Sequence, residues 1–252
     1  MILTVAGATL RESLRSRSFI GLLSLFVVFM TLSRLIGYIS ATDGDLVTTD
    51  IVLSLQSIIG LLVAVATGTA LMHMEIQQRT LYTVLSRPIA RWQFVIGKFC
   101  GLAAALLCGQ LAMLTLSLIY LWVTGAPVTP LLVLAGLLTA EEVVIMAAVS
   151  LCWTTLSTPL LAAALSLATY GLGHAVHELP GFLAYVKNDT AQWLIAVLAS
   201  LMPDLGRYAY RNQAVHGLGL APAEAAMTVA YGLLWIALLL TVTLAIFRRR
   251  QL

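Results

Sequence analysis

Two adjacent carboxylates, Glu141 and Glu142, lie in the middle of the apolar run 131–152. An ionised carboxylate at that depth in a membrane is costly unless it is paired, hydrated or protonated. Neighbouring residues of a helix point about 100° apart, so both side chains cannot squarely face one narrow route. Either glutamate is therefore a candidate for lining a substrate route. The competing interpretation is a structural pair with a neighbouring helix, through Arg34 or Gln56.

His174 and His177 are three residues apart, and Glu178 follows directly. On a helix the two imidazoles share one face, and this spacing can bind zinc or copper. Histidines at a membrane edge are more often free of metal, so these residues are only weak metal candidates. A further ligand would have to come from the same segment, from Asp189, Asp204 or His216.

The composition is that of a membrane protein. Of the 252 residues, 60% are hydrophobic and 10% are charged, with a mean hydropathy of +0.97. A soluble domain carries about a quarter of charged residues because its surface faces water. Disorder, a secreted disulfide scaffold and a soluble enzyme are therefore excluded. The class that remains is an all-α, polytopic membrane protein.

Six apolar runs are long enough to cross the bilayer as helices, since about 20 helical residues span the hydrocarbon core. The predicted spanning helices are 19–40, 51–74, 99–123, 131–152, 160–177 and 225–247. They predict a single transmembrane domain over residues 1–252. Along helix three and just before it, small residues recur every four positions, as they do at close helix contacts in lipid: Gly97, Gly101, Ala105 and Gly109.

The outer segment 178–224, between the fifth and sixth helices, contains a seventh apolar patch. This patch, 193–202, is too short to span and ends at Pro203. It predicts a half-helix that is re-entrant or lies at the interface.

Basic residues indicate the orientation. If the N-terminus is inside, 10 of the 14 Lys and Arg residues lie on the cytoplasmic side, and most acidic residues lie outside. Lys and Arg concentrate in cytoplasmic loops. The sequence therefore predicts a multi-pass protein of the cell inner (plasma) membrane with both termini cytoplasmic. No basic patch is interleaved with aromatic residues, so we expect no nucleic-acid partner.

The segment 1–18 precedes the first spanning helix and is amphipathic. Leu3, Leu10 and Leu14 recur at helical spacing, with Arg11 and Arg15 among the residues on the other side. Such a segment is expected to form an interfacial entry helix with its basic face toward the lipid head groups.

The loop 75–92, between helices two and three, is predicted to lie in the cytoplasm. Ile76, Leu81, Val84 and Leu85 can share one side of a short helix, which Pro88 ends. A short amphipathic helix held by two spanning helices is a plausible docking element for a cytosolic partner. A merely solvated basic loop is the alternative that periodicity leaves open.

Four stretches of the chain form a pattern. They are the loop with Thr80-Leu81, Leu85-Ser86-Arg87-Pro88 and Arg91-Trp92; the entry segment 10–17; the stretch that begins Met202-Pro203-Asp204-Leu205; and the tail Phe247-Arg248-Arg249-Arg250. In this order around six helices, they resemble the permease subunits of ABC-2-type exporters. The resemblance covers nearly the whole chain.

The resemblance implies that the loop 75–92 forms a coupling helix in a groove of a separate cytosolic ATPase. The residues that it implicates are Glu75, Arg79, Thr80, Leu81, Arg87, Pro88 and Arg91. This chain has no P-loop, because Gly97-Lys98 is followed by Phe99 and Trp92 stands where the motif needs glycine. We therefore expect no enzyme and no cofactor in this chain, with ATP and magnesium bound by the partner. The resemblance implies a complex of two ATPase subunits and two permease subunits, identical or different.

Two other classes of function remain open. A stand-alone, proton-coupled secondary transporter would use Glu141 or Glu142 as its proton site, although the two halves of the chain show no convincing internal match. An intramembrane zinc protease would need a His-Glu-x-x-His motif, which this sequence lacks.

Overall fold

A computed structural model describes residues 2–39, 44–77, 91–183, 188–200, 202–216 and 222–249. Over these residues the regular structure is entirely helical, which confirms the predicted all-α class. The elements are α1 (Ile2–Arg15), α2 (Arg17–Ile39), α3 (Gly44–Gln77), α5 (Arg91–Thr124), α6 (Pro130–Leu156), α7 (Pro159–Leu183), α8 (Asp189–Ser200), η1 (Leu205–Tyr208), α9 (Arg211–His216) and α10 (Pro222–Arg249).

Six of the described helices are long and apolar enough to cross a membrane, as the sequence predicts. The spans are Arg17–Gly37, Gly44–Leu71, Trp92–Thr124, Pro130–Leu156, Pro159–Leu179 and Pro222–Phe247. The second span begins at Gly44 rather than at 51, because its polar first turns are compatible with a helix. Thr48 and Thr49 donate their hydroxyls to the carbonyls of Gly44 and Asp45, at 2.7 and 2.8 Å.

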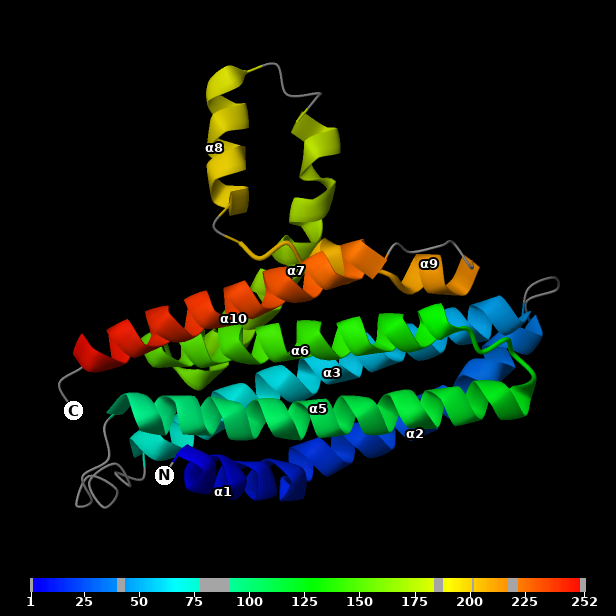
Figure 1. Ribbon diagram of the computed structural model, residues 1–252, viewed down its shortest axis with the longest axis horizontal. Coiled ribbons are helices and arrows are strands. Elements are labelled where there is room, and N and C mark those ends of the chain that lie inside the picture. The colour runs from blue at the N-terminus through cyan, green and yellow to red at the C-terminus, as the bar shows by residue number, and fades with distance from the viewer. Residues whose placement is uncertain are drawn as a thin grey trace.

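Helix α6 forms the centre of the bundle and packs against α3, α5, α7 and α10 (Figure 1). Most of α6 is buried, including Ile145, Met146 and Leu151. The outer helices instead expose apolar side chains, among them Leu160 of α7 and Leu234 of α10. An apolar exterior around a buried central helix is the arrangement expected in lipid.

Helix α1 packs closely along the first turns of α5. A methyl group added at Gly97 would lie 3.1 Å from the Ile2 carbonyl oxygen, and one added at Gly101 would lie 2.7 Å from the Thr9 Cβ. At the same contact, Lys98 Nζ lies 3.9 Å from Glu12 Oε2. The small residues of α5 thus bring it against the amphipathic helix α1.

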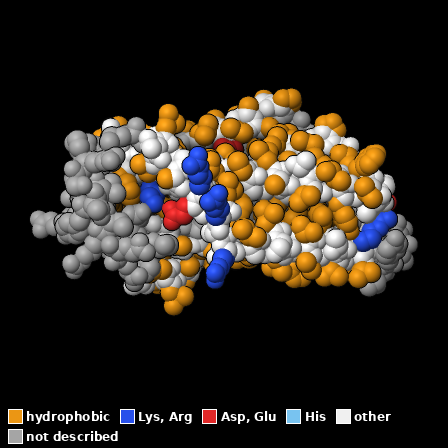
Figure 2. Space-filling model, turned by 90° about the horizontal axis from the view of Figure 1, so that it is seen from below, with side chains coloured by type: hydrophobic (Ala, Val, Ile, Leu, Met, Phe, Trp, Pro, Cys, Tyr) orange, Lys and Arg blue, Asp and Glu red, His pale blue; other side chains and the backbone are white. Residues whose placement is uncertain are grey.

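The start of α1 and the end of α10 lie at the same end of the bundle (Figure 1). Seen from the side of α1 and α2, Lys and Arg side chains gather toward this end, and a broad hydrophobic band covers the middle (Figure 2). Arg11 and Arg17 are among the exposed side chains there. At the opposite end Arg34 is paired with Asp45, Nη1 to Oδ1 at 2.8 Å.

The apolar patch predicted at 193–202 falls largely within α8, which runs from Asp189 to Ser200. The last turns of α7 and the neighbouring α8 extend away from the other helices (Figure 1). With 12 residues, α8 is about 18 Å long and too short to span a bilayer. Its place at the interface or within the membrane remains a prediction.

Candidate functional site

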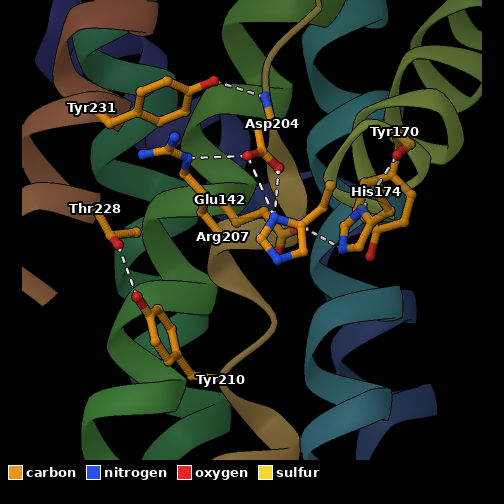
Figure 3. Close-up of polar contacts among 9 residues, drawn as sticks. Glu142, Tyr170, His174, Asp204, Arg207, Tyr210, Thr228 and Tyr231 are labelled. Carbon is orange, nitrogen blue, oxygen red and sulfur yellow. Dashed lines mark hydrogen bonds and ion pairs between the residues drawn. The ribbon is translucent and has the colours of Figure 1, made fainter. Parts of the chain in front are cut away.

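A cavity of about 290 Å³ lies between α3, α6, α7 and η1. Its polar lining comes from four helices, and apolar side chains complete the wall. The polar lining residues include Ser54 and Ser57 of α3, Glu142 of α6, Tyr170 and His174 of α7, and Arg211 of α9. Figure 3 shows how Glu142, His174 and Tyr170 gather in this region.

Glu142 supplies the buried carboxyl group of the cavity. It lies 12 residues into α6, near the middle of that 27-residue helix, and only 4% of its surface is exposed. Its Oε1 accepts no hydrogen bond from the described residues. A carboxylate so deep in an apolar bundle is unfavourable without a nearby positive charge, a proton or water.

Glu141 points elsewhere, as the 100° step of the helix requires. Both of its carboxylate oxygens are buried without a hydrogen-bond partner among the described residues. Its Oε1 lies 2.6 Å from the position that a methyl group would take on Gly232 of α10, and the Tyr208 hydroxyl is closer still to that position. Of the two glutamates, Glu142 lines this cavity and Glu141 faces α10.

His174 forms the charged contact of Glu142. Its Nε2 lies 3.4 Å from Glu142 Oε1, and its Nδ1 lies 3.3 Å from the Tyr170 carbonyl oxygen. A carbonyl only accepts, so a hydrogen bond there places a proton on Nδ1. In the neutral ring Nε2 then carries a lone pair, which would repel the carboxylate oxygen. The contact is favourable only if His174 and Glu142 together hold one further proton, on Nε2 or on the carboxylate.

An ion pair lies at the exposed rim of the cavity. Arg211 Nε lies 2.9 Å from Asp50 Oδ1, and the Arg211 side chain is 46% exposed. Arg211 Nη1 also donates to Ser54 Oγ at 2.6 Å. Deeper in, the hydroxyls of Ser57 and Tyr170 lie 3.1 Å apart. The positive charge of Arg211, which also lines the cavity, is thus paired with Asp50.

A second polar cluster lies beside the first, around Asp204 (Figure 3). Arg207 Nε lies 3.0 Å from Asp204 Oδ2, and His177 Nδ1 lies 3.3 Å from Oδ1. The Asp204 amide donates to the Tyr231 hydroxyl at 2.7 Å. These contacts join η1 and the residues before it to α7 and α10.

Tyr208 of η1 separates the cavity from α10. Its side chain is 3% exposed, and its hydroxyl donates to the Thr228 carbonyl at 3.1 Å. Burial raises the pKa of the Tyr208 phenol well above its usual value, because the phenolate would lose its hydration.

Arg34 and Gln56, which the sequence offered as alternative partners of the glutamates, contact other residues. Arg34 lies at the far end of α2 and pairs with Asp45, while Gln56 donates to the Gln110 side chain at 3.1 Å. Both side chains find partners at their own depth in the bundle. The charged pair of Glu142 is instead with His174.

The two histidines share α7 but face different carboxylates. His174 faces Glu142, whereas His177 faces Asp204. Within the described part of the chain, no group of three or more His, Cys, Asp or Glu residues is arranged to hold a metal ion. Asp204, one of the further ligands considered from the sequence, contacts only the second histidine of the pair.

The candidate coupling residues fall mostly outside the described residues. Arg79, Thr80, Leu81, Arg87 and Pro88 lie in the segment 78–90, which is not described. The two remaining candidates flank this segment. Glu75 lies in the last turn of α3, and Arg91 is the first residue of α5.

Sequence reasoning missed Tyr170, Arg211, Asp50 and Ser57 as members of the site. Each is an ordinary residue of its segment, and none carries the desolvation cost that makes a buried glutamate conspicuous. Arg211 and Tyr170 meet α3 only through the packing of α9 and α7. The available signal was the excess of polar residues in the predicted outer half of several helices.

These features define a multi-pass helical membrane protein with a polar cavity inside its bundle. The sequence model of the protein family described as ABC-2 family transporter protein matches residues 3–252 of this chain. The chain therefore belongs to this family. It is thus a membrane component of an ABC transporter, a subunit that typically lacks the ATPase domain. A search of curated proteins finds no match.

Proposed function

We propose that this chain is the permease subunit of an ATP-driven exporter, forming the translocation path for a substrate. Its family membership over residues 3–252 is the observation that carries the proposal. The working unit would contain two permease subunits and two cytosolic ATPase subunits that bind ATP and magnesium. Closure of the ATPase pair would shift the permeases between inward and outward access.

The coupling element would be the loop 75–92. Helices α3 and α5 each have 34 residues, or about 51 Å of helix, which exceeds the ~30 Å hydrocarbon core. Their surplus length can carry the connection between them beyond the lipid. The residues proposed to contact the ATPase remain Glu75, Arg79, Thr80, Leu81, Arg87, Pro88 and Arg91.

A pull-down tests the coupling loop. The tagged permease is purified in detergent with Arg79, Arg87 and Arg91 each reversed to glutamate, and co-purifying P-loop ATPase is quantified. Arg17→Glu is the matched control, because Arg17 is an exposed arginine outside the loop. We expect the loop variants to release the ATPase and the control to retain it. A permease that purifies alone and moves solute in liposomes would refute the exporter assignment.

The proposed orientation places both termini in the cytoplasm. Arg11, Arg15 and Arg17 belong to the N-terminal end of the bundle, in keeping with the excess of Lys and Arg found in cytoplasmic segments. Reporter fusions test it: a fluorescent protein active only in the cytosol and a phosphatase active only outside are attached in turn to the C-terminus. An active phosphatase fusion together with a non-fluorescent fluorescent-protein fusion would show that the C-terminus lies outside, contrary to the proposed orientation.

Glu142 is the better candidate for the substrate route, because it lines a cavity and Glu141 faces α10. Glu142→Gln preserves the shape of the side chain and removes its charge. We expect this variant to lose transport while its ATPase partner still binds. Unchanged transport would remove Glu142 from the route.

A stand-alone proton-coupled carrier is the second candidate function. One observation favours this carrier: the contact between Glu142 and His174 requires a single proton. Such a pair of residues can exchange that proton with the cavity. Deleting the gene of the partner ATPase separates the two candidates. Only the exporter would lose all transport.

A further inference from the structure

The cavity combines one buried carboxylate with hydroxyls, aromatic rings and apolar side chains. Glu142, 4% exposed, lines it with an oxygen that accepts no hydrogen bond from the described residues. We propose that this cavity binds a small organic cation, a protonated primary amine with an apolar body, and that its ammonium group pairs with Glu142. The proposal deepens the assignment of Glu142 to a substrate route, on which it rests, by naming the chemical class of the ligand.

The charges around the cavity favour a cation at Glu142. The neighbouring charged and titratable groups are Asp50 of α3, Glu141 of α6, Tyr170, His174 and His177 of α7, Asp204 and Arg207 at η1, Tyr208 of η1, and Arg211 of α9. Asp50 neutralises Arg211, and Asp204 is paired with Arg207 and His177. Glu142 is left with His174, which is not a permanent charge.

The wall of the cavity suits the three donors of an ammonium group. Ser57 and Tyr170 present hydroxyl oxygens, and Thr139 lies on the same helix one turn before Glu142. Tyr170 and Tyr208 also line the cavity, and aromatic side chains attract organic cations. A primary ammonium has three N–H donors, so the Glu142 carboxylate and two of these hydroxyl oxygens can take the place of its water.

The size of the cavity favours a molecule over a single ion. Its volume of about 290 Å³ corresponds to roughly ten water molecules, at ~30 Å³ each. Leu53, Ile58 and Ala135 give part of the lining an apolar character. An amine with a short aromatic or aliphatic body would fill both the polar and the apolar parts.

A bound amine would displace the proton that Glu142 and His174 share. The contact between His174 Nε2 and Glu142 Oε1, 3.4 Å apart, needs one proton when the cavity is empty. An ammonium beside Glu142 supplies the positive charge instead. Binding is therefore expected to release up to one proton per site, and amine affinity should rise with pH while the amine itself stays protonated.

Calorimetry on the purified full-length permease in lipid nanodiscs, without the ATPase, tests the proposal. The probe is 2-phenylethylamine, and 2-phenylethanol is its uncharged analogue. We expect binding of the amine only, with an enthalpy that depends on the ionisation heat of the buffer because a proton is released. Glu142→Gln should weaken the amine at least about tenfold, the value of a charge-assisted hydrogen bond.

Glu141→Gln is the matched control, since it makes the same change at the next residue, which faces α10 and does not line the cavity. It should keep amine affinity within about twofold. Equal affinity for amine and alcohol, equal effects of the two variants, or no binding to wild-type protein would overturn the amine site. Because the alcohol comparison uses the wild-type chain, it stays valid even if Glu142→Gln fails to fold.

The exporter assignment and the amine site fail in different ways. Co-purification of an ATPase without any amine binding would overturn only the site. Amine binding to a permease that recruits no ATPase would overturn only the exporter assignment.

Discussion

Gly101 is a position where α1 approaches α5 closely. An added Cβ would meet the Ala6 carbonyl oxygen and would lie 2.7 Å from the Thr9 Cβ and 3.0 Å from the Ala6 Cα. These atoms belong to the backbone or are fixed to it, so no change of rotamer relieves the contact. Gly101→Ala must therefore push α1 away from α5.

The expected cost follows from these distances. Ordinary contacts begin near 3.4 Å, so the helices must separate by roughly 1 Å. Overpacking of this kind costs about 1–3 kcal/mol. Gly7→Ala is the control, because nothing lies within 4 Å of its added Cβ. There, the helix propensity of alanine should stabilise the protein by about 0.5–1 kcal/mol.

The free energy of unfolding is measured by SDS titration of each variant in the same detergent, and hydrogen exchange reports on α1. We expect Gly101→Ala to lower the free energy and to speed exchange of the α1 amides, and Gly7→Ala to do neither. If Gly101→Ala is as stable as Gly7→Ala, the close packing of α1 on α5 is refuted.

Three further predictions concern single polar side chains. Gln56→Leu removes the hydrogen bonds to the Gln110 side chain and to the Gly136 carbonyl inside the bundle and should cost about 0.6–2 kcal/mol in SDS titration, and unchanged stability would argue against these bonds. Tyr231→Phe leaves the Asp204 amide without its acceptor, and we expect a loss of about 1–3 kcal/mol together with faster exchange of that amide. Burial raises the pKa of Tyr208, so unfolded protein releases this proton first, and stability should fall as the pH rises above about 10. Tyr208→Phe should reduce that alkaline loss in melts at pH 8 to 11, whereas an unchanged pH profile would contradict it.

The sequence predicted the membrane helices well because length and hydropathy are local properties. The predicted start of the second helix at 51 lies too late because polar residues continue the helix, as Thr48 and Thr49 do by donating to carbonyls one turn earlier. The spacing of Gly97 and Gly101 indicated a close helix contact. It could not show that the partner is α1, because any helix backbone can occupy such a groove.

The site was predicted only in part, and the reason is physical. Desolvation cost is a property of a single residue, so Glu141 and Glu142 stood out in the sequence. Their partners depend on which helices come together at that depth. Arg34 and Gln56 are bound by Asp45 and Gln110, and the true neighbour of Glu142 is His174.

The two adjacent glutamates also show why identity and spacing leave a functional assignment open. The 100° between them places Glu142 in a cavity with His174, and places Glu141 against Gly232 and Tyr208. The position of Tyr208 depends on the turn that Asp204 holds through Arg207, His177 and Tyr231. A conformational change that moved η1 would therefore alter the surroundings of both carboxylates together. In a transporter, this would link the opening of the cavity to the charge that it can hold.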